Sequence, residues 1–347
     1  MPVYRQGYRR WRGELAGRGW RWLAITRAGV ALTARSRWLR RFVLVAWLPL
    51  LYYALLFFLV GQATELRNVQ RLEDEWRFQV LRGLFGGSLT ERFIADPAAF
   101  RPVIWSLLLH LFLRYTQVFS VMIVVAIVGP RLVSEDLRSR ALALYFSKPI
   151  GRVDYILGKL GVVAFWVATV SLLPGLALYA LSIAFSPSLE TLSQTWHLLP
   201  RLGLYSLILV VGTGAPMLAL SSLTPNPRFL GFAWAAAWVM SSVASSILRF
   251  ALHPPLPRGS IEAASGGDWT GLVSFSANFH AVSFRLFEIG TQMAPVAAIN
   301  PRAERWVKRL AYDHDWSWSL GLIVAVSVVS LALVAWRVGR PGEAGAR

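Results

Sequence analysis

A glycine–lysine pair, Gly158-Lys159, is the place in the chain that suggests binding of a nucleotide phosphate. A P-loop needs the pattern G-x-x-x-x-G-K-[ST], because successive backbone N–H groups must wrap the phosphate and a hydroxyl must meet Mg²⁺. Here six residues separate Gly151 from Gly158, and Leu160 stands where the hydroxyl is required. The sequence therefore predicts that this chain does not bind ATP through a P-loop.

A second chemical candidate is Asp313-His314-Asp315, which places three potential metal or proton ligands in one short segment. We favour the simpler interpretation, an ordinary polar loop end. Cysteine is absent, which excludes disulfides, thiolate catalysis and cysteine-based metal sites. No histidine pair has the spacing of a zinc site; the five histidines are His110, His197, His253, His280 and His314. We expect no metal and no cofactor in this chain.

Eight charged residues lie in the stretch 134–160, SEDLRSRALALYFSKPIGRVDYILGKL, between two apolar runs. Its first part has helical propensity, with acids near its start, where the helix dipole favours them. Pro149 lacks an N–H and biases Lys148 towards extended geometry, which predicts a break between two helical pieces. Such a helix and turn can dock on a partner protein, although a solvated charged loop is the alternative. The charged residues are Glu135, Asp136, Arg138, Arg140, Lys148, Arg152, Asp154 and Lys159.

The elements that position these residues are apolar segments long enough to cross a bilayer. The 347-residue chain is 55% hydrophobic and only 16% charged, whereas a soluble protein has about 25% charged residues. A helix of about 20 apolar residues spans a hydrocarbon core, and the runs lack the alternation of a β-barrel strand. We therefore predict an all-α polytopic membrane protein with six spans, at 42–61, 115–133, 160–184, 202–223, 229–248 and 317–336.

The distribution of basic residues predicts the orientation of the spans. With the N-terminus inside, the inner segments (1–41, 134–159 with Arg131, 224–228 and 337–347) hold 21 basic and five acidic residues. The outer segments hold 13 of each, leaving Arg114 and Arg249 at span ends. This asymmetry predicts that both termini are inside, and it explains most of the net charge of +18. The basic residues of 1–41 are therefore expected to fix topology and meet anionic lipid headgroups rather than nucleic acid.

Several segments between the spans carry weaker patterns. Residues 20–37 are consistent with a helix in the inner interface, with Trp22, Ile25, Gly29 and Leu32 on one side; a basic leader that only sets topology is the alternative. The outer segments are 62–114, 185–201 and a long aromatic loop at 249–316. Within the first, 101–114 fits either an interfacial helix or an extension of the second span.

Two further stretches have alternative interpretations. The serines of 240–247, MSSVASSI, either line a polar path or allow close helix packing, and packing is favoured. The turn at 221–228, SSLTPNPR, is a candidate for a second, smaller contact with a partner on the inner side.

The stretch after the second span resembles the first cytoplasmic loop of ABC-2 type exporter permeases. In that family a span ends at a Glu or Glu-Asp pair, and a Ser-x-Pro-[IV]-x-Arg element and a Gly-Lys pair follow before the next span. The chain departs from the family at 137–142, LRSRAL, where a Gly-Thr pair is common. The matching residues are Glu135-Asp136, Ser147-Lys148-Pro149-Ile150-Gly151-Arg152 and Gly158-Lys159.

The resemblance implies that the chain is the permease subunit of an ATP-driven exporter in a bacterial inner membrane. It implies a separate ABC ATPase subunit that binds ATP and Mg²⁺, and a homodimer or heterodimer of permeases. The residues expected to couple to the ATPase are Glu135, Asp136, Arg138, Lys148, Pro149, Arg152, Asp154 and Lys159.

Two other functions were weighed against transport. One is a membrane scaffold or mechanotransmitter, in which the ATPase drives an external partner through the loop 249–316. The other is a polytopic membrane enzyme, which needs a nucleophile with a base or clustered carboxylates at membrane depth. The predicted spans contain no acid and no histidine, and His110 lies outside the span that follows it. The enzyme is therefore the least favoured of the three.

Overall fold

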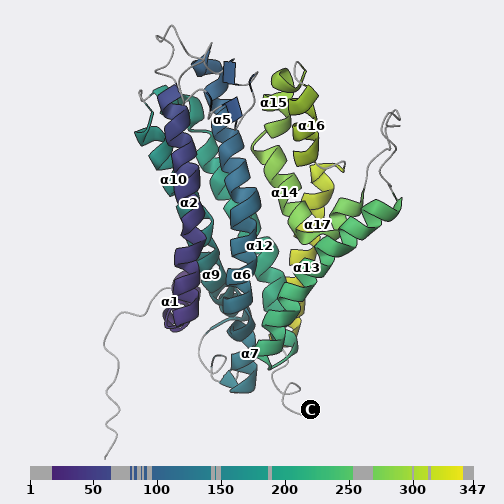
Figure 1. Cartoon of the computed structure of the whole chain (residues 1–347). Helices are drawn as coiled ribbons and strands as arrows, with labels where there is room; N and C mark the ends of the chain where they lie inside the picture. The colour runs from purple at the N-terminus through teal and green to yellow at the C-terminus, as the bar shows by residue number, and fades with distance from the viewer. Residues whose placement is uncertain are drawn as a thin grey trace, which may run out of the picture.

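The computed structural model of the chain describes residues 18–63, 96–141, 150–186, 190–252, 269–298, 301–311 and 314–338, with isolated positions in 79–91 and at 145. The regular elements in this part of the chain are all helices (Figure 1). Six helical stretches are long and apolar enough to cross a membrane: Arg37–Gly61, Phe100–Arg138, Arg152–Ala184, Leu198–Leu223, Pro227–Leu252 and Trp316–Val338. This confirms an all-helical chain with six candidate membrane spans.

The second span is much longer than the predicted 115–133. It consists of α5 (Pro97–Leu111), a π-helical stretch η4 (Phe112–Gln117), α6 (Val118–Val128) and α7 (Pro130–Arg138). The stretch Phe100–Arg138 has 39 residues, which is about 58 Å of helix at 1.5 Å per residue. This length exceeds the hydrocarbon core of about 30 Å. The outer segment 101–114 is therefore a continuation of the span and not a separate interfacial helix.

Polar residues in the first half of this span have partners inside the protein. Arg101 donates to Gln194 Oε1 at 3.1 Å, and His110 Nδ1 lies 2.8 Å from Ser283 Oγ. Arg114 donates to the carbonyl of Leu310 at 2.6 Å. The helix can thus continue through residues that would be costly to bury against lipid.

The remaining elements also differ in length from the predicted segments. Helix α1 (Arg21–Thr33) follows a short turn η1 (Arg18–Trp20), and α2 (Arg37–Ala63) forms the first span. The third span is α9 (Arg152–Val170) with α10 (Leu172–Ala184), so it begins at Arg152 instead of residue 160. The charged segment predicted as a loop at 134–159 is therefore helical at both of its ends.

The fourth to sixth spans complete the set of long helices. The short helix α11 (Glu190–Thr195) precedes α12 (Leu198–Leu223), and α13 (Pro227–Leu252) and α17 (Trp316–Val338) are the fifth and sixth spans. The interior of the bundle lies around α12, where 72% of the most apolar stretch is buried, against 6% for α13.

The segment predicted as a long outer loop, 249–316, is largely helical where it is described. It contains the end of α13, η5 (Trp269–Val273), α14 (Phe275–Leu286), α15 (Ile289–Ala297) and α16 (Pro301–Leu310). Helix α14 contacts α12, α13 and α17. The ring of Phe279 stacks on Trp238 of α13 at 6.0 Å and 10°. The expected loop is thus partly an element of the bundle.

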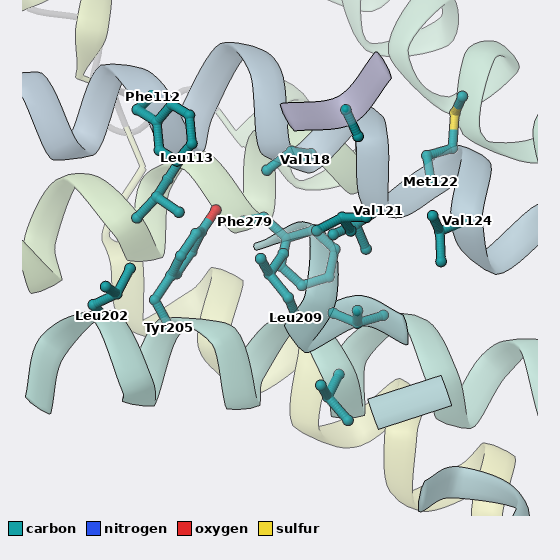
Figure 2. Close-up of a cluster of buried hydrophobic side chains, with 14 of the residues drawn as sticks. Phe112, Leu113, Val118, Val121, Met122, Val124, Leu202, Tyr205, Leu209 and Phe279 are labelled. Atoms are coloured by element: carbon teal, nitrogen blue, oxygen red, sulfur yellow. The ribbon is translucent and has the colours of Figure 1, made fainter. Parts of the chain in front are cut away.

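Glycines on α12 allow its close contacts. A Cβ at Gly212 would lie 2.8 Å from side-chain atoms of Ile323 and Phe279, and one at Gly214 would lie 2.8 Å from Leu160. Around them, large side chains from the second span, α12 and α14 fill the interior (Figure 2). Tyr205 and Phe279 are among the largest fully buried side chains.

Helix α1 packs along α9, again through glycines. A Cβ at Gly158 would lie 2.6 Å from Ile25 Cβ, and one at Gly29 would lie 2.5 Å from Val162. Thr26 Oγ1 donates to the carbonyl of Gly158 at 3.0 Å. The prediction of an apolar side on this helix is partly correct, since Ile25 is buried but Leu32 is 59% exposed.

The elements near the charged segment gather at one end of the bundle. Figure 1 shows α1, α7, the start of α13 and the end of α17 at the lower end, and α5, α15 and α16 at the upper end. Both ends of the described chain therefore lie on the same side.

Candidate functional site

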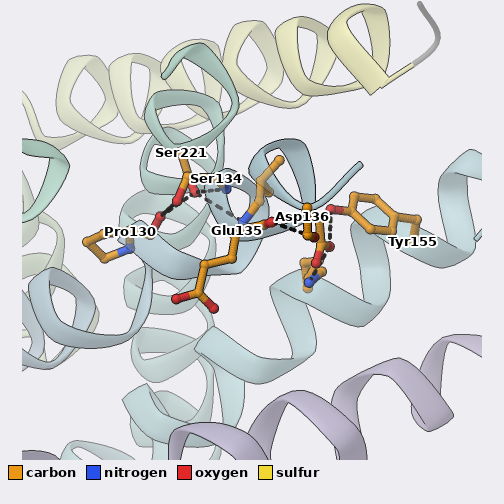
Figure 3. A network of polar contacts seen from close by, with 9 residues as sticks. Pro130, Ser134, Glu135, Asp136, Tyr155 and Ser221 are labelled. Atoms are coloured by element: carbon orange, nitrogen blue, oxygen red, sulfur yellow. Dashed lines mark hydrogen bonds and ion pairs between the residues drawn. The ribbon is translucent and has the colours of Figure 1, made fainter. Parts of the chain in front are cut away.

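A compact cluster around Asp136 joins the second and third spans. The Lys159 ammonium lies 2.6 Å from Asp136 Oδ2, and the Tyr155 hydroxyl donates to the same carboxylate oxygen at 2.7 Å (Figure 3). The side chains of Lys159 and Asp136 are only 11% and 15% exposed. The ammonium also lies 5.4 Å from the centre of the Tyr155 ring and 5.9 Å from that of Tyr145.

Local helix geometry explains how the sequence builds this cluster. Tyr155 and Lys159 are four residues apart on α9 and therefore lie on one face of the helix. Asp136 is in the last turn of α7. The start of α9 is fixed by Asp154, whose Oδ2 accepts from the backbone N–H of Gly151 at 3.0 Å.

The cluster is an ion pair largely removed from solvent. Removal of one partner of such a pair destabilises the protein, because the other charge is left buried and uncompensated. Burial and the negative charge of Asp136 raise the pKa of Tyr145, which therefore stays protonated at neutral pH. The arrangement is suited to holding α7 and α9 together.

A second contact holds α7 against the C-terminal end of α12. Ser221 Oγ accepts from the backbone N–H groups of Val133 and Ser134, each at 3.1 Å, and donates to the carbonyl of Pro130 at 2.8 Å (Figure 3). These N–H groups lie in the first turn and a half of α7, after Pro130. One buried hydroxyl on α12 therefore contacts three backbone groups of α7 and ties the two helices together.

The predicted coupling residues divide into two groups. Asp136, Asp154 and Lys159 make the contacts above. Glu135 and Arg131 form only a loose pair of 3.9 Å with 34% and 67% exposed side chains, and Figure 3 shows Glu135 pointing away from the Asp136 cluster. Arg138 and Arg152 are exposed, and Lys148 and Pro149 lie outside the described residues.

Tyr145, Tyr155 and Ser221 are the site residues that sequence reasoning missed. The spacing of Tyr155 and Lys159 was a usable signal, because i,i+4 places them on one helix face. The role of Ser221 depends on the packing of α12 on α7 and has no local signal. Gly158, which suggested a phosphate loop in the sequence, is a position where α1 packs closely on α9.

The other sequence candidates have structural partners. Ser242 Oγ lies 3.2 Å from Ser274 Oγ, and Ser245 donates to the Thr270 carbonyl at 2.8 Å. The serine stretch of α13 therefore packs against η5 and the start of α14. His314 Nε2 lies 2.8 Å from Ser319 Oγ, and Asp313 is outside the described residues. Within the described ranges, no group of three His, Cys, Asp or Glu side chains could hold a metal.

Comparison of the sequence with known proteins found no matching family model and no matching curated protein.

Proposed function

We propose that the chain is the permease subunit of an ATP-driven exporter and that a separate ABC ATPase docks on the segment between α7 and α9. The basic residues around both termini and around this segment support an inner-side position for all three. ATP and Mg²⁺ are bound by the ATPase, and two permease chains, identical or related, form the pathway through the lipid bilayer.

The observation that carries the proposal is the attachment of this segment to several helices at once. The Asp136–Lys159 pair joins α7 to α9, Ser221 joins α7 to α12, and Thr26 joins α1 to α9. A displacement of the segment by a partner therefore acts on α1 and three spans together. A partner that binds differently before and after ATP hydrolysis would shift the balance between two arrangements of these helices.

The exposed side chains near the segment are suited to docking. Arg138 and Arg152 are exposed and Glu135 is partly exposed, whereas the Asp136–Lys159 pair is largely buried. The three exposed side chains offer charge to a partner, and the buried pair supports the helices that carry them. This division of roles predicts that docking and folding can be separated by mutation.

The test is to purify the tagged chain from its own host's membranes in mild detergent and to identify bound proteins by mass. We expect a stoichiometric soluble protein that carries a Walker A motif. The triple variant Glu135→Gln, Arg138→Gln, Arg152→Gln should lose it while still inserting in the membrane. A matched control at the opposite end, Glu304→Gln with Lys308→Gln, neutralises an exposed pair on α16 and should retain it. Recovery of the chain alone, under several gentle conditions, would contradict the proposal.

The scaffold alternative has less support from the structure. It needs an outer element free to engage an external partner, whereas α14 packs against α12, α13 and α17. Transport is therefore preferred. A membrane enzyme has no supporting cluster among the described residues.

A further inference from the structure

A cavity of about 280 Å³ lies between three spans. One wall is the inner half of α12, residues 216–223, and the facing wall is α13 with Trp234, Ala237 and Trp238. Phe275 of α14 and Ser330 of α17 complete the lining. All three spans are helices long and apolar enough to cross a membrane, so the cavity lies among membrane-crossing segments.

Rigid aromatic side chains shape one wall of the cavity. Trp238 stacks with Phe275 at 5.9 Å and 16°, and with Phe279 on α14 at 6.0 Å and 10°. The indole N–H of Trp234 donates to the carbonyl of Met122 at 3.2 Å, which fixes the orientation of that ring. The cavity is therefore held open by packed rings and does not depend on a loop.

Water is a poor occupant of this cavity. Its volume has room for several water molecules, each of which needs two to four polar partners. Among the lining residues, Ser330 contributes the only hydroxyl. This partly open, apolar lining offers water few of those partners, and if the space is empty its lining atoms forfeit dispersion contacts. An apolar occupant would recover those contacts.

The neighbourhood of the cavity indicates where such an occupant comes from. Helix α13 has only 6% of its most apolar stretch buried, and Figure 1 shows its C-terminal half leaning away from the other spans. Beyond Trp238, the side chains of Val239, Met240 and Val243 are 50–68% exposed. The medium beside the cavity is therefore the hydrocarbon of the bilayer.

We propose that this cavity binds an acyl chain of a membrane phospholipid, inserted between α13 and the pair α12 and α17. The chain fills the space against the Trp238–Phe275 wall, and the headgroup stays at the membrane surface. Its presence sets the angle of α13 to the bundle, because α13 forms one wall of the cavity. This inference does not depend on the identity of the ATPase partner.

The experiment uses the full chain reconstituted in vesicles of phosphatidylcholine that carries a photoactivatable diazirine in mid-chain. After illumination, the cross-linked peptides are identified by mass. We expect cross-links concentrated at 216–223 and 234–238, above those on the exposed apolar residues of α2. Ala237→Phe fills the cavity from its own wall and should abolish these cross-links. Ala236→Phe, at the neighbouring position that does not line the cavity, is the matched control and should preserve them.

Two outcomes would overturn the proposal. One is cross-linking at 216–223 and 234–238 that is no more frequent than on α2, or that persists in Ala237→Phe. The other is a non-lipid apolar molecule, found by native mass spectrometry of the purified chain and displaced by Ala237→Phe, which would assign the cavity to a solute. Because Ala237 is exposed, the variant is expected to fold, and an unchanged Tm verifies this.

Discussion

Replacing Asp136 by Asn tests whether the Asp136–Lys159 pair holds the second and third spans together. Asn keeps the size of the side chain and an acceptor for Tyr155, but it leaves the Lys159 ammonium without its carboxylate. Loss of one partner of a buried pair costs about 3–5 kcal/mol. Since the two side chains are still 15% and 11% exposed, we expect the lower end, about 3 kcal/mol. This corresponds to a decrease in Tm of roughly 4 °C for a chain of this size.

The assay is thermal unfolding of the purified chain in mild detergent, with Glu135→Gln as the neighbouring control. The Arg131–Glu135 pair is 3.9 Å apart and largely exposed, so its loss should change stability by less than about 1 kcal/mol. The double variant Asp136→Asn, Lys159→Met removes both charges and should recover much of the loss. Equal effects of Asp136→Asn and Glu135→Gln, or no recovery in the double variant, would refute the reasoning.

Three further predictions follow from buried polar groups and from topology. Ser221→Ala removes the hydroxyl that bonds the backbone of α7 and should destabilise the chain by about 0.5–1.5 kcal/mol, whereas Ser222→Ala, which loses only a bond within its own helix, should have a smaller effect on Tm. Gln117 is fully buried and neither of its amide atoms has a partner among the described residues. Gln117→Leu should therefore raise the free energy of unfolding by about 1–3 kcal/mol. A lower Tm in this variant would show that the amide is satisfied. Because the chain has no cysteine, single cysteines can test the orientation. An impermeant thiol reagent added to intact cells should label Ser193→Cys but should reach Ser139→Cys only after permeabilisation. Labelling of Ser139→Cys in intact cells would contradict the proposed orientation.

The number and class of the spans were predictable from the sequence, but their lengths were not. Apolar runs identify the segments that must cross a bilayer. They fail for the second span because Arg101, His110 and Arg114 interrupt its hydropathy. Their partners lie on α11, α14 and α16, distant in sequence, so no local pattern indicates that the helix continues.

The candidate site was predicted as a set of charges and not as an arrangement. The stretch 134–160 identified Asp136 and Lys159, which are 23 positions apart, but their pairing depends on how α7 meets α9. The same limit applies to Gly158, whose position beside Lys159 suggested a phosphate loop. Glycine is required at this position because α1 approaches α9 closely there. This is a tertiary contact, and the spacing of nearby residues does not indicate it.

The unequal attachment of the spans determines which of them can move at least cost. Changing the angle of a helix exposes the apolar surface that it buries, at about 25 cal/mol per Å². Helix α12 is enclosed by α9, α14 and α17. Helix α13 contacts α6 near its start, where Trp234 bonds the Met122 carbonyl and Gly231 lies close to Ala126, and it contacts η5 and α14 further along. Its contacts with α6 lie directly before α7 and the Asp136 cluster, so a displacement of α7 reaches α13 near its start. Because only 6% of its most apolar stretch is buried, α13 can tilt with less loss of apolar burial than α12.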